Sequence, residues 1–186
     1  TGAMLSMARD AGHAGRLVGL DPAKGMIEQA RRRLDIEWIQ GDLKSTAFDR
    51  SFDLVVMTGH AFQVFVEDQD VRDALAAARR ALADEGRFAF ETRNPAARAW
   101  EHWARGYSKE IVDRSGAAVR MTTVIDAPFD GRIVSFSHHF TSSRWERAQT
   151  SKSTLRFLGV DELAALIKEA GMTIEMQFGD WDRCPL

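Results

Sequence analysis

Two carboxylates follow short apolar segments near the start of the chain, and their positions suggest a ligand with hydroxyl and amine groups. Asp21 follows the apolar segment 16–20, and Asp42 follows Gly41 about one β-α-β unit later. In nucleotide-binding sheets, the ribose hydroxyls are held by an acid at the end of a buried strand that comes after a glycine turn and a helix in the sequence. A second acid at the end of the next strand can reach the exocyclic amine of an adenine. The pair therefore predicts an adenosine-containing cofactor.

Each carboxylate also has an ordinary structural role that the sequence leaves open. Aspartate is a preferred N-cap residue, so Asp21 can cap a helix that begins at Pro22. Asp42 can belong to the turn that ends a strand. The spacing of Asp21 from Gly2 favours ribose binding, and the pairing with Asp21 favours an adenine contact for Asp42.

A second group of candidates follows the apolar segment 53–57, at a strand end where α/β sheets bind ligands. Gly59 permits a close backbone approach to a ligand. His60 is the best candidate for a general base, because its unperturbed pKa lies near neutrality. The alternative is a partly buried histidine that bonds to the backbone. We expect Thr58 and Gly59 to contact the cofactor. Phe62 and Gln63 are expected to contact the substrate.

A third group follows the expected strand 87–91. Arg93 or Asn94 can hold a polar or anionic substrate, with Pro95 fixing the turn; a purely structural turn with an exposed arginine is the alternative. His138 and His139 are neighbours in an expected strand and must point to opposite faces, so we predict no metal site there.

The composition sets limits on the class of protein. The 186 residues are enough for one domain, and a net charge of −2 provides no basic field for nucleic acid. The single cysteine, Cys184, excludes an intramolecular disulfide and a cysteine-built zinc site. No apolar run has the length of a membrane span, and no secretory signal is visible. We expect a cytoplasmic protein with no nucleic-acid or membrane partner.

Helical and strand patterns alternate in the first half of the chain, which is typical of a doubly wound, mostly parallel α/β sheet. The expected helices cover residues 3–11, 22–34 and 71–82, and the expected strands cover 16–20, 36–39, 53–57 and 87–91.

The pattern changes near residue 95 and predicts an antiparallel β insertion late in the chain. A helix or lid is expected over 100–107, strands over 119–125, 133–140 and 153–158, a helix capped by Asp161, and a last strand over 172–178. Asp130 and Gly131 form a strong hairpin turn pattern between the first two of these strands.

These residues resemble the class I S-adenosylmethionine-dependent methyltransferases. In that family an acid ends the second strand, a Gly-Asp pair ends the third, and a Phe-Asp-Leu-Val strand, as in segment 51–57 here, borders the methyl donor. Segment 83–88 is similar to the turn before the fifth strand. The resemblance implies that these residues contact the cofactor: Thr1, Gly2, Asp21, Met26, Asp42 and Leu43. Pro22, Thr58 and Gly59 are further expected cofactor contacts, since they follow strand ends at the same site.

The chain also departs from the family. The first strand and most of the glycine loop precede Thr1 in the family, and a last antiparallel strand follows the segment 181–186. We therefore expect a single methyltransferase-like domain, residues 1–186, that is truncated at both ends. Unpaired strand edges would then make a homodimer possible.

The function that the resemblance implies is methyl transfer from S-adenosylmethionine to a nitrogen or oxygen atom of a small molecule. His60 is needed as a base only if the acceptor must lose a proton, and the inserted segment 100–154 is expected to cover the pocket. Two alternatives stay open. One is an NAD-dependent oxidoreductase, whose sheet also carries an acid after its second strand; the other is a non-catalytic binding domain.

Overall fold

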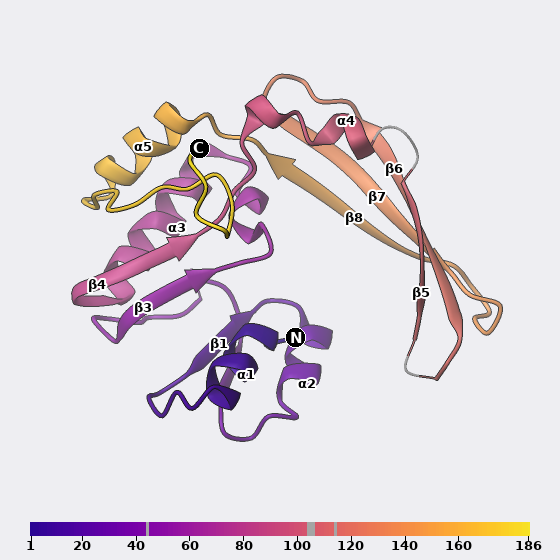
Figure 1. Cartoon of the computed structure of the whole chain (residues 1–186), viewed down its shortest axis with the longest axis horizontal. Coiled ribbons are helices and arrows are strands. Elements are labelled where there is room, and N and C mark those ends of the chain that lie inside the picture. Colours follow the sequence, from indigo (N-terminus) through magenta and orange to yellow (C-terminus); the bar gives the residue numbers. More distant parts are fainter. Residues whose placement is uncertain (44, 104–106, 114) are drawn as a thin grey trace.

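The fold has an α/β part, which comes first in the chain, and an antiparallel sheet that lies beside it (Figure 1). The structure is a computed structural model, and it describes residues 1–43, 45–103, 107–113 and 115–186. Parallel strand pairs early and an antiparallel sheet late confirm the fold class expected from the sequence.

The first parallel pair joins β1 (Val18–Asp21) and β2 (Glu37–Gln40), with Asp21 opposite Gln40. Helix α1 (Ala3–Asp10) precedes β1, and helix α2 (Lys24–Ala30) connects the two strands. The helix expected from Pro22 begins two residues later, at Lys24. Its N-cap residue is Ala23, because the Asp21 carboxylate accepts the Ala23 N–H in a tight turn before the helix.

One aromatic ring determines where glycine is needed around β1. The indole of Trp38 lies directly over Gly19, where an added Cβ would be 2.2 Å from the ring, and over Gly2, where it would be 2.1 Å away. Gly2 also has a φ of +72°, a left-handed conformation that favours glycine. Close contact with Trp38 therefore requires the absence of a side chain at both positions.

The second parallel pair joins β3 (Phe52–Met57) and β4 (Leu82–Phe90), and the connection contains the 3₁₀ turn η1 (Ala61–Val64) and helix α3 (Asp68–Ala81). Helix α5 (Val160–Glu169) packs against α3 and contributes to the main apolar core. The buried members of that core are Phe62, Val71, Leu75, Leu158, Leu163, Leu166 and Ile167.

The antiparallel sheet has the order β5-β6-β7-β8, with strands Ser108–Val112, Ala118–Ala127, Ile133–Thr141 and Gln149–Arg156. The predicted hairpin around Asp130 and the third strand are confirmed. Strand β5 was not predicted, because all of its residues are exposed and give no alternating apolar pattern. The turn η2 (Pro95–Ala97) and helix α4 (Trp100–Trp103) lead into the sheet, and the rings of Trp100, Trp103, Phe129, Phe136 and Phe157 pack together.

Two expectations near the end of the chain are wrong. Gly159, not Asp161, is the N-cap of α5, so the Asp161 carboxylate lies within the first turn of the helix. Segment 172–178 is not a strand, since no described strand hydrogen-bonds to it. Two of its apolar side chains accordingly remain exposed, Ile174 at 45% and Met176 at 64%.

A buried arginine joins the antiparallel sheet to the α/β part. Arg156, the last residue of β8, is 1% exposed, and its Nη2 lies 2.7 Å from Asp68 of α3 and 2.9 Å from Glu162 of α5. Its Nη1 also donates to the Val66 carbonyl at 3.3 Å. Helix α3, helix α5 and the segment at Val66 are thereby held at the end of β8.

In the part of the chain that the structure describes, the helices lack the length and apolar character that crossing a membrane requires.

We predict that Gly19→Ala destabilises the protein by about 1–3 kcal/mol, because the new Cβ overlaps the Trp38 ring. The matched control is Gly25→Ala in α2, where an added Cβ has no atom within 4 Å. The control is expected to stabilise the protein by about 0.5–1 kcal/mol, because alanine favours the helix. Urea unfolding measures the free energy of unfolding of both variants. Equal stability of the two would contradict the packing argument.

Candidate functional site

The first predicted cluster forms at the carboxyl ends of β1 and β2. The Asp21 carbonyl accepts the Gly41 N–H at 3.1 Å, which places the turn that contains Asp42 beside the end of β1. The Asp42 carboxylate accepts the Ser45 N–H at 2.8 Å, and the Ser45 hydroxyl accepts the Asp42 N–H at 2.8 Å. These bonds fix the turn, so both acidic residues lie at one edge of the pair, as the sequence predicts.

The other residues predicted to contact the cofactor lie around this edge. The Thr1 ammonium is 3.9 Å from the Met26 sulfur, which brings the start of α1 to α2. Met26 is 47% exposed and is thus accessible to a ligand. Pro22 is exposed in the turn after Asp21, and Leu43 is half-buried.

The chemistry of this edge fits a nucleoside. One oxygen of Asp21 accepts the Ala23 N–H at 2.8 Å, while within the described ranges no protein group bonds to its second oxygen. A carboxylate oxygen with no protein partner can accept a hydrogen bond from a ribose hydroxyl.

The second cluster lies where β3 and β4 end. Thr58 leads into Gly59 and His60, which have φ values of +72° and +58°. A left-handed conformation is unfavourable for histidine. The Glu91 carboxylate compensates by accepting the backbone N–H of His60 at 2.9 Å. The imidazole Nδ1 lies 3.7 Å from the same carboxylate oxygen.

The environment of His60 favours the neutral imidazole. Burial lowers the pKa of His60, and the positive charge of Arg93 lowers it further, while Glu91 opposes both. Its Nδ1 is buried and has no hydrogen-bond partner among the described residues. A neutral ring at physiological pH can accept a proton, which agrees with the role of a base.

The third cluster connects Arg93 to the interior. Gln63 is 1% exposed, and its side-chain amide donates to the Arg156 carbonyl at 2.9 Å. Its side-chain oxygen accepts Nη1 of Arg93 at 2.7 Å. The guanidinium of Arg93 also lies over the Trp103 ring, 4.9 Å from its centroid. Gln63 and Trp103 together determine the position of the Arg93 charge.

Two of the predicted acceptor contacts have structural partners. Phe62 is 1% exposed within the main core, and its ring is 4.4 Å from that of Phe90. The Asn94 side chain accepts the Ala96 N–H at 2.9 Å and caps η2, as in the turn proposed as its alternative. Their roles in acceptor binding stay predictions.

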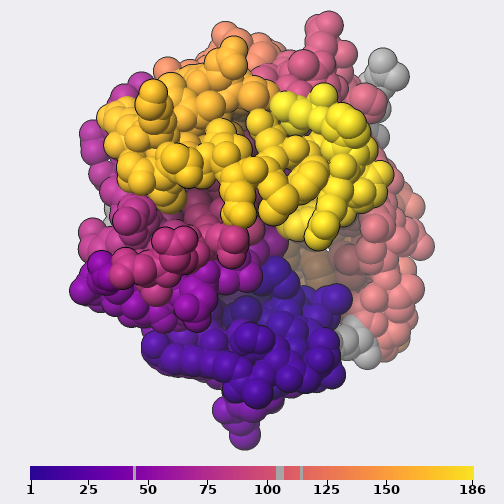
Figure 2. All heavy atoms as spheres, turned by 60° about the vertical axis from the view of Figure 1, so that its left-hand side comes forward, coloured from indigo at the N-terminus to yellow at the C-terminus, as the bar shows by residue number. Residues whose placement is uncertain are grey.

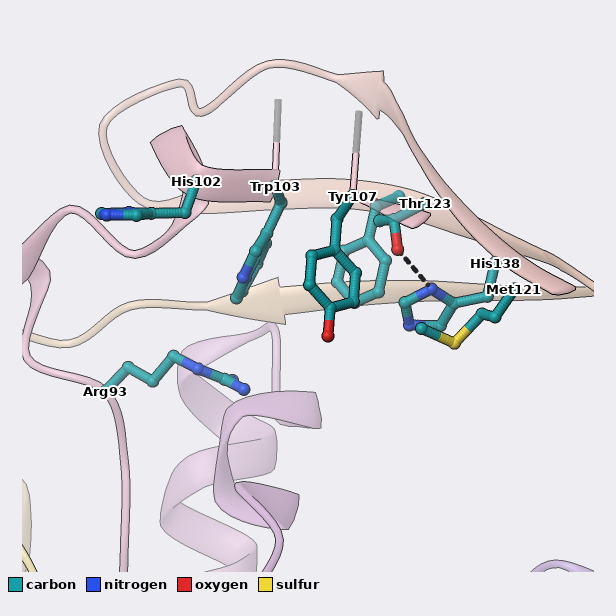
Figure 3. A pocket seen from close by; sticks show the side chains of 8 residues that line it. Arg93, His102, Trp103, Tyr107, Met121, Thr123 and His138 are labelled. Carbon is teal, nitrogen blue, oxygen red and sulfur yellow. Dashed lines mark hydrogen bonds between the residues drawn. The ribbon is translucent and has the colours of Figure 1, made fainter. Parts of the chain in front are cut away.

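Arg93 lines a cavity of about 310 Å³ between the end of β4 and one face of the antiparallel sheet. Figure 3 shows Arg93 at one end of this cavity, with His138 and Met121 at the other. The full lining is Arg93, His102, Trp103, Tyr107, Met121, Thr123, Phe136 and His138. A separate depression of about 400 Å³ is lined by Trp145, Glu146, Arg147 and Gln149 and contains none of the predicted site residues.

Sequence reasoning missed most of the residues that line this cavity. Four of them come from the antiparallel sheet, where Met121 and Thr123 alternate along β6 and Phe136 and His138 alternate along β7. A two-residue period marks one face of a strand, so the pattern was present, but it did not reveal what that face meets. His138 Nδ1 lies 2.9 Å from the Thr123 hydroxyl, and burial lowers the pKa of His138.

The N-terminal part and the antiparallel sheet border a recess. In Figure 1 the arrowheads of β3 and β4 point toward the antiparallel sheet. Figure 2 shows a recess between the indigo N-terminal part and the salmon antiparallel strands, with the yellow C-terminal segment above it. The acidic residues lie at the carboxyl ends of β1 and β2, and the cavity lies against the antiparallel sheet. This arrangement can hold a nucleoside and a second small molecule.

The comparisons with known proteins concern the first half of the chain and the fold. Residues 1–86 match the methyltransferase domain family. No curated protein matches the sequence.

Several solved structures share the fold. The sugar N-methyltransferase KedS8 from a Streptoalloteichus species has a TM-score of 0.76 at 17% identity, over 92% of this chain and 68% of that protein. DesVI from Streptomyces venezuelae has a TM-score of 0.76 at 21% identity, over 100% of this chain and 80% of that protein. CalS10 from Micromonospora echinaspora is an amino pentose methyltransferase, and its structure has S-adenosylmethionine bound. Its TM-score is 0.71 at 21% identity, over 98% of this chain and 76% of that protein.

We predict that Arg93→Gln raises the pKa of His60, because it removes a positive charge that disfavours the imidazolium. Glu91→Gln should lower it, because the neighbouring negative charge is lost while the amide oxygen can still accept the His60 N–H. NMR titration of the ring protons measures both shifts. His138, whose pKa burial alone lowers, is the internal control and should respond to neither change; an unchanged His60 pKa in both variants would refute the electrostatic coupling.

Proposed function

We propose that the chain is a class I S-adenosylmethionine-dependent methyltransferase and that it methylates an amino nitrogen of a small-molecule acceptor. The observation that carries the proton-accepting step is the neutral imidazole of His60, which lies beside Glu91 and within the field of Arg93, a residue of the cavity. The fold-level neighbours KedS8 and CalS10 act on a sugar nitrogen and on an amino pentose, which supports an amino sugar as the acceptor.

On the cofactor side, the carboxyl ends of β1 and β2 provide the binding groups. When bound, S-adenosylmethionine supplies a methyl group that is electrophilic because it is attached to a positively charged sulfur. Asp21 accepts hydrogen bonds from the ribose hydroxyls, and Met26 packs on the adenine. Asp42 and Leu43 contact the edge of that base, and Thr58 and Gly59 border the reacting end.

On the acceptor side, the protein must orient an amine and remove a proton from it. An ammonium group has no lone pair, so the nitrogen reacts only after deprotonation. His60 accepts that proton, and burial keeps the ring neutral and ready to do so. Alignment of the amine by the cavity walls supplies a further part of the rate acceleration.

The antiparallel sheet provides acceptor specificity in this proposal. Helix α4 and strands β6 and β7 contribute most of the cavity lining, and they belong to the segment 100–154. Changes in this sheet would alter which acceptor fits while leaving the cofactor edge of β1 and β2 intact.

Calorimetric titration with S-adenosylhomocysteine, with NAD as the comparison ligand, tests the proposal. We expect micromolar binding of S-adenosylhomocysteine and no binding of NAD. Mass spectrometry of reactions with amino sugars and their hydroxyl analogues then identifies the methylated atom. Binding of NAD alone would favour the oxidoreductase, and binding of neither ligand to the folded protein would favour the non-catalytic domain.

Asp21→Ala should weaken S-adenosylhomocysteine binding about 10-fold or more, because it removes a charged hydrogen-bond acceptor worth roughly 1.5–3 kcal/mol. Asp161→Asn is the control, since Asp161 is an exposed acid in α5, away from the β1 edge. Unchanged affinity in Asp21→Ala would remove the assignment of the ribose contact.

His60→Asn should lower kcat by about 10²-fold or more, because the proton acceptor is lost while asparagine tolerates the left-handed backbone. In the wild-type protein, activity should fall on acidification through a pKa below 6.5, as His60 becomes protonated. That acidic limb should disappear in the variant with the same acceptor. An identical pH profile in both proteins would show that His60 is not the base.

A further inference from the structure

We propose that the acceptor carries an anionic group, a carboxylate or a phosphate, and that Arg93 binds this group inside the cavity. The inference rests on the proposed function, because it defines the acceptor class of the same site.

Within the described part of the chain, the charge of Arg93 has no ion-pair partner. Among the residues that the structure describes, no carboxylate lies within 4 Å of its guanidinium nitrogens, whereas the more deeply buried Arg156 has both Asp68 and Glu162. Glu91, the acid whose charge acts on Arg93, directs one oxygen to the His60 N–H. Arg93 is half-buried, and a charge withdrawn from water without a counter-charge is unfavourable. An anionic ligand would supply that counter-charge.

The guanidinium is held in one position before any ligand arrives. Gln63 accepts one N–H at 2.7 Å, and the guanidinium carbon lies over the Trp103 ring, 4.9 Å from its centroid. Gln63 is itself fixed by its bond to the Arg156 carbonyl at 2.9 Å. An arginine has five N–H donors in a planar fork, so donors remain for a two-point contact with a carboxylate or phosphate. A pre-positioned fork loses little conformational entropy on binding.

The remainder of the cavity indicates what is attached to the anion. Trp103, Tyr107, Met121 and Phe136 provide apolar and aromatic walls, and His138 lies at the end opposite Arg93 (Figure 3). A volume of about 310 Å³ is at the small end of the range for ligand pockets. The acceptor that fits is a single ring or a compact chain with an anionic group at one end.

Three small probes test this inference on the full chain: phenyl phosphate, benzoate and neutral benzamide. Calorimetry or ligand-observed NMR should show that at least one anionic probe binds 10-fold or more tightly than benzamide. The comparison of phenyl phosphate with benzoate identifies which anion the site prefers. Because this experiment uses the wild-type protein, it needs no variant to fold, and equal affinity for all three probes would overturn the proposal.

Arg93→Gln should reduce the affinity for the preferred anion 10-fold or more and leave the affinity for benzamide unchanged. Arg93→Lys keeps the charge but loses the planar fork, so it should retain part of the anion binding. Arg120→Gln is the matched control, because Arg120 is exposed and its position in β6 adjoins Met121, which places it on the opposite face of the sheet. Undiminished anion binding in Arg93→Gln would refute the role of Arg93.

Titration of the same samples with S-adenosylhomocysteine separates this inference from the proposed function. If S-adenosylhomocysteine binds and the anion preference is absent, the inference fails while the methyltransferase assignment stands. If the anion preference depends on Arg93 and S-adenosylhomocysteine does not bind, the anion site stands and the proposed function fails.

Discussion

The buried side chain of Arg156 is the interaction on which the arrangement of the two parts depends. A charged group that is 1% exposed must find counter-charges, and those available to Arg156 come from α3 and α5, outside its own sheet. Removal of these partners would leave a buried charge without compensation, which is unfavourable. The end of β8 is therefore anchored to the α/β part, and the antiparallel sheet has a defined place beside the ends of β3 and β4.

The candidate acceptor site follows from that anchoring. The Arg156 carbonyl orients Gln63, and Gln63 in turn orients Arg93 at the end of the cavity. One continuous set of hydrogen bonds thus runs from the contact between the two parts to the residue that would meet the acceptor. The same contact brings the positive charge of Arg93 close enough to His60 to help keep that imidazole neutral.

The cofactor edge is held by short-range contacts and not by the ion pairs of Arg156. Tight turns after β1 and β2 hold its acidic residues through local hydrogen bonds, and the Trp38 ring lies against glycines where no side chain fits. These are short-range constraints within a βαβ unit. They leave the cofactor edge independent of the antiparallel sheet, so the sheet can vary with the acceptor while the edge stays the same.

The sequence alone determined the features that are encoded locally: the two parallel pairs, the hairpin around Asp130, and the acidic residues after β1 and β2, because turn chemistry and apolar periodicity act over a few residues. It also identified His60, Gln63 and Arg93 as candidates, since all three follow strands of a parallel sheet. Only the tertiary structure decided what they face. Apart from Arg93, the residues that line the cavity lie between positions 102 and 138. The face of the sheet that meets the cavity is set by long-range packing and by the ion pairs of Arg156, which no local sequence pattern predicts.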